Sequence, residues 1–187
     1  MKLFLRLIWL ILTQSRRPRL DIMGTSETPL RVFPNDLDIF MHVNNGVYLT
    51  YADLGRTDLM LRSGTFKRVR ERGWYPVAAE ASIRYRKSLT LGQRFIIRTR
   101  IAGWDDRAIY LEQDFMHGDT LVAQAFIDAR FLVKGGGKVS VSELLEYLNI
   151  DPQPPEMPVA MQRWIEGKRR DSTGATDTSE STLARTG

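Results

Sequence analysis

The stretch from Asp36 to Asn45, D-L-D-I-F-M-H-V-N-N, is the densest cluster of polar side chains in the chain. It holds two carboxylates, an imidazole and two amides within ten residues, more than a connecting loop requires. Apolar and small residues then recur every three or four positions through residues 45–64, which predicts one helix. Asn44 or Asn45 would cap this helix and Gly64 would end it.

The polar cluster therefore stands at a predicted helix N-terminus. Unpaired N–H groups and the positive end of the helix dipole make such a position suited to stabilising an oxyanion. A carboxylate there would stay ionised, able to attack a thioester carbon or to orient water. The alternative is structural: Asp36 and Asp38 make turn bonds, while Asn44 and Asn45 cap the helix. The residues alone leave both interpretations open.

The rest of the chain predicts an α+β architecture. We expect a short strand at Leu30 to Phe33 and a second helix at Val141 to Leu148. Ala52 and Gly55 on the inner face of the first helix would let a curved sheet approach its backbone closely. Glycine and aspartate at the joints between the later β-type runs favour short turns, hence an antiparallel meander. These runs are Trp74 to Tyr85, Phe95 to Trp104, Ala108 to Met116 and Thr120 to Val133.

Composition limits the possible functions. The length of 187 residues and a hydrophobic content of 43% suit one ordinary domain with a real core. The absence of cysteine excludes disulfides, thiolate zinc sites and a cysteine nucleophile. The two histidines, His42 and His117, are too few for a histidine-rich metal site. We expect a basic, apolar segment at 1–20, a linker at 21–29, the domain at 30–170 and a disordered tail at 171–187.

The net charge of +5 arises entirely before Asp21. From residue 21 onward, 22 basic residues face 22 acidic ones, so the body of the protein has no net positive field to hold a phosphate backbone. Nucleic acid is therefore not an expected partner. The five basic residues that precede Asp21 are Lys2, Arg6, Arg16, Arg17 and Arg19.

The N-terminal run LFLRLIWLIL, residues 3–12, is apolar apart from one arginine. As a helix it would be about 15 Å long, half of a hydrocarbon core, and no small-residue cleavage site follows it. We expect it to lie in an anionic membrane surface, with Trp9 at headgroup depth and Arg16, Arg17 and Arg19 on the lipid. The protein would then be cytoplasmic and peripheral at the inner membrane. The alternatives are a helix docked on its own domain or on a partner, and an uncleaved signal anchor.

Four segments, taken in order, resemble the hotdog-fold thioesterases of the 4-hydroxybenzoyl-CoA thioesterase type. They are the strand at Arg31 to Phe33, the loop DLDIFMHVNN, the helical YLTYADLGR and the later YRKSLTLGQ. In that superfamily a D-x-D-x-x-x-H-x-N-N loop opens a long central helix wrapped by an antiparallel β-sheet. The similarity to the subfamily of thioesterase superfamily member six and its bacterial relatives continues through GWDDRAIYLE and PPEMP, over about residues 30–166. The resemblance implies a hotdog fold.

The resemblance also implies roles for loop residues. Asp38 matches the family's catalytic aspartate, a nucleophile or a base for water. His42 matches the histidine that plant acyl-carrier-protein thioesterases place four residues later, which would position the thioester or protonate the departing sulfur. Phe40 and Ser88 depart from the plant pattern, since they stand where those enzymes carry an asparagine and a glutamate.

Further residues are candidates for holding the substrate. The basic residues beside the SLTLG turn would bind coenzyme A phosphates, although a strand's solvent-exposed face has the same pattern. Tyr48, with Tyr51 and Met60, would line an acyl pocket, although such a helix stripe is also typical of plain core. The candidate substrate-binding residues are Asn44, Asn45, Tyr48, Arg84, Arg86 and Lys87.

The function implied by the resemblance is hydrolysis of an acyl thioester, acyl-CoA above all, to free acid and thiol by a homodimer. No metal or bound cofactor is needed, because coenzyme A enters as part of the substrate. The alternative is a non-catalytic acyl-binding or membrane-associated hotdog protein, as Phe40 and Ser88 permit. A hotdog dehydratase is disfavoured, because the polar cluster matches the thioesterase loop.

Overall fold

The computed structural model describes residues 2–13 and 16–170. The predicted disordered tail, residues 171–187, lies outside these ranges. Every helix within the described ranges is too short or too polar to cross a bilayer.

The chain divides after Pro154 into two compact units. The first contains the whole sheet and the helices α1 to α4. In the second, residues 159–170 are helical.

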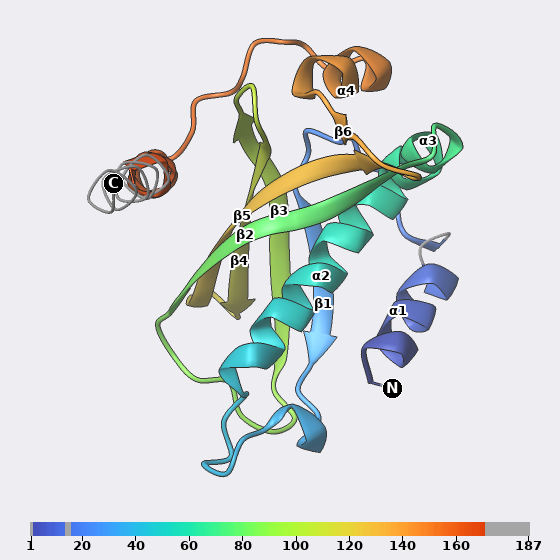
Figure 1. Cartoon of the computed structure of the whole chain (residues 1–187). Coiled ribbons are helices and arrows are strands. Elements are labelled where there is room, and N and C mark those ends of the chain that lie inside the picture. The colour runs from blue at the N-terminus through green and yellow to red at the C-terminus, as the bar shows by residue number, and fades with distance from the viewer. Residues whose placement is uncertain (1, 14–15, 171–187) are drawn as a thin grey trace, which may run out of the picture. The chain divides into compact units, whose positions relative to one another are not determined.

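Six antiparallel strands among the described residues form one sheet in the order β1-β3-β4-β5-β2, with the short β6 beside β5 (Figure 1). The bounds of the four longer strands match the predicted runs: β2 and β5 start and end as expected, and β3 and β4 differ by at most one residue at each end. β2 has one edge that no strand in the described ranges covers. The strands are β1 (Ser26–Arg31), β2 (Trp74–Tyr85), β3 (Arg94–Trp104), β4 (Ile109–His117), β5 (Thr120–Val133) and β6 (Lys138–Val139).

The central helix α2 (Asn45–Arg62) lies across one face of this sheet (Figure 1). At Gly55 an added Cβ would lie 2.6 Å from the Thr99 hydroxyl oxygen and 2.8 Å from Gln113 Nε2, so only glycine fits. The Gln113 amide donates to the Ala52 carbonyl and to the Thr99 hydroxyl, both at 2.9 Å. The predicted close approach at Ala52 and Gly55 is confirmed. A long helix wrapped by an antiparallel sheet is the hotdog fold.

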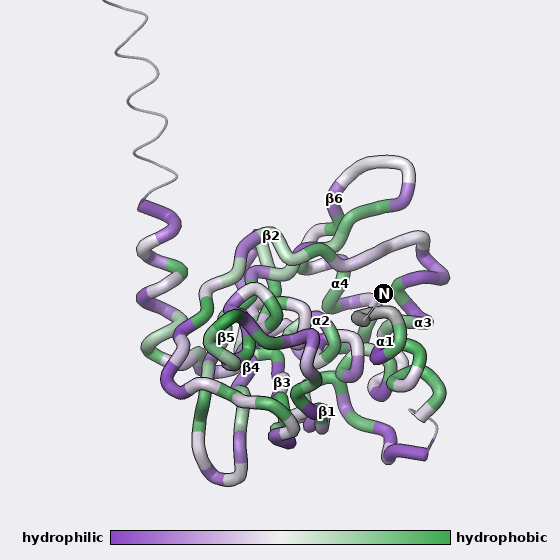
Figure 2. Tube along the Cα trace, turned by 90° about the horizontal axis from the view of Figure 1, so that it is seen from below, coloured by the Kyte–Doolittle hydropathy of each residue, from purple (hydrophilic) through white to green (hydrophobic). Residues whose placement is uncertain are grey.

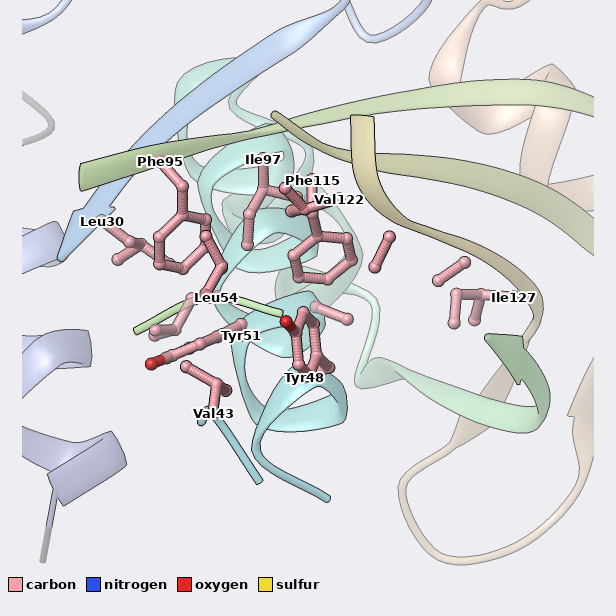
Figure 3. Close-up of a cluster of buried hydrophobic side chains, with 14 of the residues drawn as sticks. Leu30, Val43, Tyr48, Tyr51, Leu54, Phe95, Ile97, Phe115, Val122 and Ile127 are labelled. Atoms are coloured by element: carbon pink, nitrogen blue, oxygen red, sulfur yellow. The ribbon is translucent and has the colours of Figure 1, made fainter. Parts of the chain in front are cut away.

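Aromatic rings dominate the core around the N-terminal half of α2 (Figure 3). The ring centroids of Tyr48 and Phe115 are 5.4 Å apart with the planes steeply inclined, and those of Tyr51 and Phe95 are 5.0 Å apart. Such edge and tilted contacts are favourable beyond the area that they bury. All four side chains are buried, so this end of α2 is tightly packed.

A second cluster of buried side chains lies under α3 (Thr65–Glu71) and α4 (Val141–Leu148). α4 has its predicted bounds, because the Ser140 hydroxyl accepts from the Glu143 amide and caps it. The short helix α3 was not predicted. α4 covers this end of the core with Val141, Leu144, Leu145 and Leu148.

The N-terminal helix α1 (Lys2–Thr13) packs on its own domain. Leu10 is 1% exposed within the first core cluster, and the Arg6 guanidinium lies 2.5 Å from a carboxylate oxygen of Asp36. The face of α1 that carries Arg6 and Leu10 therefore lies against the domain and not in a membrane surface. For this face the alternative prediction, a helix docked on its own domain, is the one that the structure shows. The trace of α1 is mostly apolar in Figure 2, and Trp9 remains half exposed.

Arg17 is also engaged inside the domain rather than free for lipid. Its guanidinium lies 2.6 Å from the Asp58 carboxylate, which has no exposed side-chain surface. Ser26 and Thr28 donate to the same carboxylate at 2.6 and 3.0 Å. Arg6 and Arg17 of the basic segment therefore bind two buried aspartates, Asp36 just before α2 and Asp58 near its end.

The predicted linker at 21–29 is wrong in its second half. β1 begins at Ser26, four residues before the predicted strand, and pairs with β3. Pro29 made this stretch resemble a linker. It is tolerated because β1 lies at an edge of the sheet, where a missing N–H breaks no ladder.

Candidate active site

The loop before α2 is a tight hairpin. A bridge joins Leu37 to Val43, and between them the Asp38 amide donates to the His42 carbonyl at 2.8 Å. The Met41 amide closes a turn on the Asp38 carbonyl at 3.1 Å. Met41 has a φ of 62°, in the left-handed region that few residues other than glycine adopt. Non-glycine residues held in this way are concentrated at functional sites.

Asp38 lies at the centre of this hairpin, half-buried. Its Oδ1 accepts from the amides of Phe40 at 2.9 Å and His42 at 3.2 Å. The turn bonds of the structural alternative are therefore present. Among the described residues, Oδ2 has no hydrogen-bond donor. One carboxylate oxygen thus fixes the loop, and the other is left for a ligand.

The tip of the hairpin presents apolar side chains to solvent. Ile39 is 89% exposed and Phe40 is 73% exposed. His42 is exposed too, and its backbone forms a bridge with Thr90. The structure thus brings the Asp38 carboxylate to the His42 backbone. The surrounding surface exposes the large apolar side chains of Ile39 and Phe40.

α2 begins as predicted. The Asn44 side chain accepts from the Gly46 amide at 2.9 Å, and the Val47 amide donates to the Asn44 carbonyl at 2.9 Å. Asn45 is the first helical residue. Its N–H has no acceptor within the described part of the chain. It is therefore the helix-terminal donor that remains for an oxyanion.

Asp36 has a structural role. It is 3% exposed, pairs with Arg6 and accepts from the Phe33 amide at 2.8 Å. Burial alone would raise the pKa of its carboxyl, but the bonds from Arg6 and Phe33 outweigh burial and hold the pKa below its usual value. Burial, together with the Asp36 charge, raises the pKa of the neighbouring Tyr51 phenol. Sequence reasoning missed Arg6, because its partner is 30 residues away.

The predicted phosphate-binding residues lie where β2 ends. Arg84, Arg86 and Lys87 are exposed. Between them, Tyr85 donates from its hydroxyl to the Asn45 carbonyl at 3.0 Å, which ties this basic strand end to the start of α2. The structure therefore brings the basic residues and the hairpin to the same end of the central helix.

Tyr48 does not stand at this surface. It is 2% exposed, with its ring 5.1 Å from that of Tyr85. A space of about 350 Å³ lies at the other end of α2, and Met60 lines it, whereas Tyr48 and Tyr51 do not. The sequence gives no distinct signal for it, because β2 and β5 each contain three alanines, of which only Ala78 and Ala129 line the space.

Metal-binding side chains are not gathered anywhere in the described ranges. No three of the histidine, aspartate and glutamate residues described lie close enough together to hold an ion.

Comparison with known proteins agrees with the fold. Residues 32–165 match the family model of the thioesterase-like superfamily. Protein THEM6 from Xenopus laevis is 37% identical over 76% of this chain and 67% of its own length, and Protein THEM6 from Danio rerio is 33% identical over 87% and 80%. The crystal structure of YbaW, a probable thioesterase from Escherichia coli, superposes with a TM-score of 0.61 at 25% identity, covering 65% of this chain and 95% of that one. The chain belongs to the thioesterase-like superfamily.

Proposed function

We propose that this protein hydrolyses an acyl-CoA thioester to a free acid and coenzyme A at the hairpin that opens α2. The proposal rests above all on the Asp38 carboxylate, which is anchored by one oxygen in the hairpin that leads into α2. Membership of the thioesterase-like superfamily supports the reaction type. The acyl-CoA substrate follows from the loop's resemblance to coenzyme A thioesterases.

The reaction needs few groups. In the general-base route, Asp38 takes a proton from water as the water oxygen attacks the thioester carbon. In the covalent route, Asp38 attacks this carbon itself, and water then cleaves the resulting anhydride. The oxyanion accepts from the Asn45 N–H, next to the positive end of the α2 dipole. The C–S bond breaks, and the thiolate takes a proton from His42 or from solvent.

The coenzyme A moiety would lie along the end of β2. Arg84, Arg86 and Lys87 offer three exposed cations near Asn45, and phosphates bind such cations through charge-assisted hydrogen bonds. Asn44 would contact the substrate beside them. In this proposal the thioester would lie between the basic strand end and the hairpin.

We also propose that the protein is a homodimer joined through β2. An uncovered strand of twelve residues is a template for pairing. A two-fold antiparallel pairing would set the Trp74 end of β2 beside the partner's Tyr85 end, so that the partner's hairpin would approach the cavity wall at Pro76 to Ala78. Light scattering on the full chain should give twice the monomer mass, and monomer alone at micromolar concentration would refute the pairing.

Peripheral membrane attachment remains a separate proposal. The outer face of α1 carries exposed apolar side chains at Leu5, Trp9, Ile11 and Leu12. Arg17 is committed to Asp58 and contributes little to lipid binding. Vesicles with anionic lipid should therefore retain the full chain through this face, and failure to sediment with them would remove the proposal.

A non-catalytic acyl-binding protein is the second candidate function. The Asp38 turn bonds favour it, since they give the carboxylate a purely structural use. Phe40 and Ser88, both exposed, replace polar residues of the plant enzymes.

Asp38→Asn distinguishes the two candidates. Asparagine keeps the oxygen that accepts from Phe40 and His42 but removes the charge. Hydrolysis of acyl-CoA should fall about a hundredfold or more, the scale of losing a base or nucleophile, with an unchanged melting temperature. Asp119→Asn, in the exposed β4–β5 turn, is the matched control. Full activity in Asp38→Asn would reject the mechanism, and a wild type that binds acyl-CoA without hydrolysis would establish the second function.

A further inference from the structure

A groove between α1 and the β1–β3 pair has no part in the proposed reaction. It has a volume of about 640 Å³, within the range of small-molecule sites. Its walls come from α1, from β1 with the start of β3, and from the end of β4 with the turn that follows. α1 lies beside β1, the edge strand of the sheet (Figure 1). The described residues that line the groove include three arginines and no acidic residue.

Two cross-strand pairs of β1 and β3 differ in how their charges are balanced. Glu27 stands opposite Arg98, and the two side chains form an ion pair at 2.9 Å. Four residues along, Arg31 stands directly opposite Arg94, and both are exposed. Like charges directly opposite each other destabilise an antiparallel pair. Within the described ranges neither arginine has a carboxylate partner, so their repulsion is not relieved.

The two guanidinium groups are available to an anion, unlike the third arginine of the wall. Arg6 is already paired with Asp36 at 2.5 Å. Arg31 donates from Nε to the Gly92 carbonyl at 3.1 Å, which holds its side chain in place. The Nη groups of Arg31 and the whole Arg94 side chain have no acceptor in the part of the chain that the structure describes. Arginines held in this way suit a phosphate group, whose oxygens accept several hydrogen bonds at once.

The rest of the groove is apolar. Ile96 pairs with Pro29 on one side and with Met116 on the other, so three apolar side chains adjoin the arginines on the same face of the sheet. Trp9 and Phe33 are each 49% exposed at the wall. Free phosphate would leave this apolar surface in water, whereas a ligand that joins a phosphate to an apolar body would cover it.

We propose that this groove binds one molecule of an anionic glycerophospholipid, with its phosphate between Arg31 and Arg94 and its glycerol end along Trp9. The phosphate supplies the counter-charge that the arginine pair lacks. The acyl chains continue along the exposed apolar face of α1, to which Trp9 also belongs, and tryptophan is typical of the depth of lipid headgroups. The site goes beyond the proposed hydrolysis, which does not use it. It adds a choice between lipid headgroups to the attachment proposed for α1.

Arg94→Gln tests the site, and Arg98→Gln is the matched control. Each removes one exposed cation from β3, but the Arg98 charge is already balanced by Glu27. The probe is dihexanoyl phosphatidic acid, titrated calorimetrically into the full chain. Arg94→Gln should weaken binding about tenfold, the effect of losing a charge-assisted hydrogen bond, and Arg98→Gln less than about twofold. The melting temperature of ligand-free Arg94→Gln should be equal to or above that of wild type, because a like charge is removed.

Four results would overturn the proposal. They are equal affinity of wild type and Arg94→Gln for phosphatidic acid, equal affinity of wild type for dihexanoyl phosphatidylcholine, an equal loss in Arg98→Gln, and displacement of the lipid by an equal concentration of inorganic phosphate or coenzyme A. The last would indicate a general anion or nucleotide site. Vesicles of phosphatidylcholine with phosphatidylglycerol separate the two membrane proposals. If they retain wild type and Arg94→Gln equally, attachment through α1 stands and the headgroup site fails.

Discussion

The two ends of α2 differ in almost every physical respect. At the N-terminal end a hairpin is fixed by short hydrogen bonds, a left-handed Met41 and a tightly packed aromatic cluster. At the C-terminal end, apolar side chains surround an unfilled space of about 350 Å³. A helix terminus fixes polar groups with precision, whereas alanines in a sheet leave room for an apolar chain. The proposed reaction belongs to the first end, where polar groups are held in place.

One feature joins the two ends. Arg6 and Arg17, from the segment before β1, each pair with a buried aspartate, Asp36 beside the hairpin and Asp58 near the end of α2. The helix is thus held at both ends by one basic segment. The pairs differ in their surroundings, because Asp36 is bonded to the Phe33 amide and Asp58 to two hydroxyl groups.

The largest effect on stability is expected at Asp58. Asp58→Ala removes a fully buried carboxylate and leaves Arg17, Arg62, Ser26 and Thr28 without their shared acceptor. Breaking a buried charge pair from one side costs about 3–5 kcal/mol of unfolding free energy. Urea denaturation measures the loss.

The control for this change lies on the same helix. Asp53→Ala breaks an ion pair with Arg56 in which the carboxylate is largely exposed. It should cost no more than about 1 kcal/mol. Equal losses in Asp58→Ala and Asp53→Ala would show that the buried cluster does not anchor α2.

A smaller, pH-dependent effect is expected at the hairpin end. The pKa of Asp36 is lowered in the folded state, so its pair with Arg6 stabilises the fold above the ordinary aspartate pKa of about 3.9. This stabilisation is lost as the pH falls through the folded-state value. Arg6→Met should therefore cost about 1–3 kcal/mol at pH 7 and less at pH 3. Part of the loss in unfolding free energy should remain at pH 3, because Arg6 also lies over the rings of Phe33 and Tyr51.

Denaturation of both proteins at the two pH values measures this difference. A cost that does not change with pH would mean that the Arg6–Asp36 charge pair contributes nothing. The structure would then hold α1 by packing at Leu10 alone.

The smallest effect concerns the basic end of β2. Arg86→Ala combined with Lys87→Ala removes two exposed cations, each worth up to about 1 kcal/mol. KM for acyl-CoA should rise about fivefold at low salt with little change in kcat, and the difference should shrink as salt is added. Arg70→Ala with Lys67→Ala, on α3, is the matched control. An equal rise in KM for this control pair would indicate a general charge effect.

Regular patterns in the sequence predicted much of the fold. α2 and α4 follow from apolar spacing and capping residues, Asn44 and Ser140 among them, because these signals are local. The predicted start of β1 is four residues too late, because Pro29 suggests a linker. Only the strand order shows that β1 lies at an edge, where proline is harmless.

Features that depend on distant residues could not be predicted. An apolar run with arginines fits a lipid surface and a protein surface equally well, and α1 was assigned to lipid because its partners, Asp36 and Asp58, stand far along the chain. The cavity depends on the pairing of Ala78 with Ala129, a register that only the folded sheet defines. The hairpin residues Asp38 and His42 could be named from the resemblance, but the anchoring of Asp38 by the loop amides required the structure.

The proposed role of Asp38 is tested most directly by hydrolysis rates for acyl-CoA esters from butanoyl to octadecanoyl. Wild type, Asp38→Asn and the control Asp119→Asn are compared at equal concentration. Asp38→Asn should lower kcat about a hundredfold or more at every chain length, whereas Asp119→Asn should keep the wild-type rate. Hydrolysis by Asp38→Asn at the wild-type rate would contradict the account.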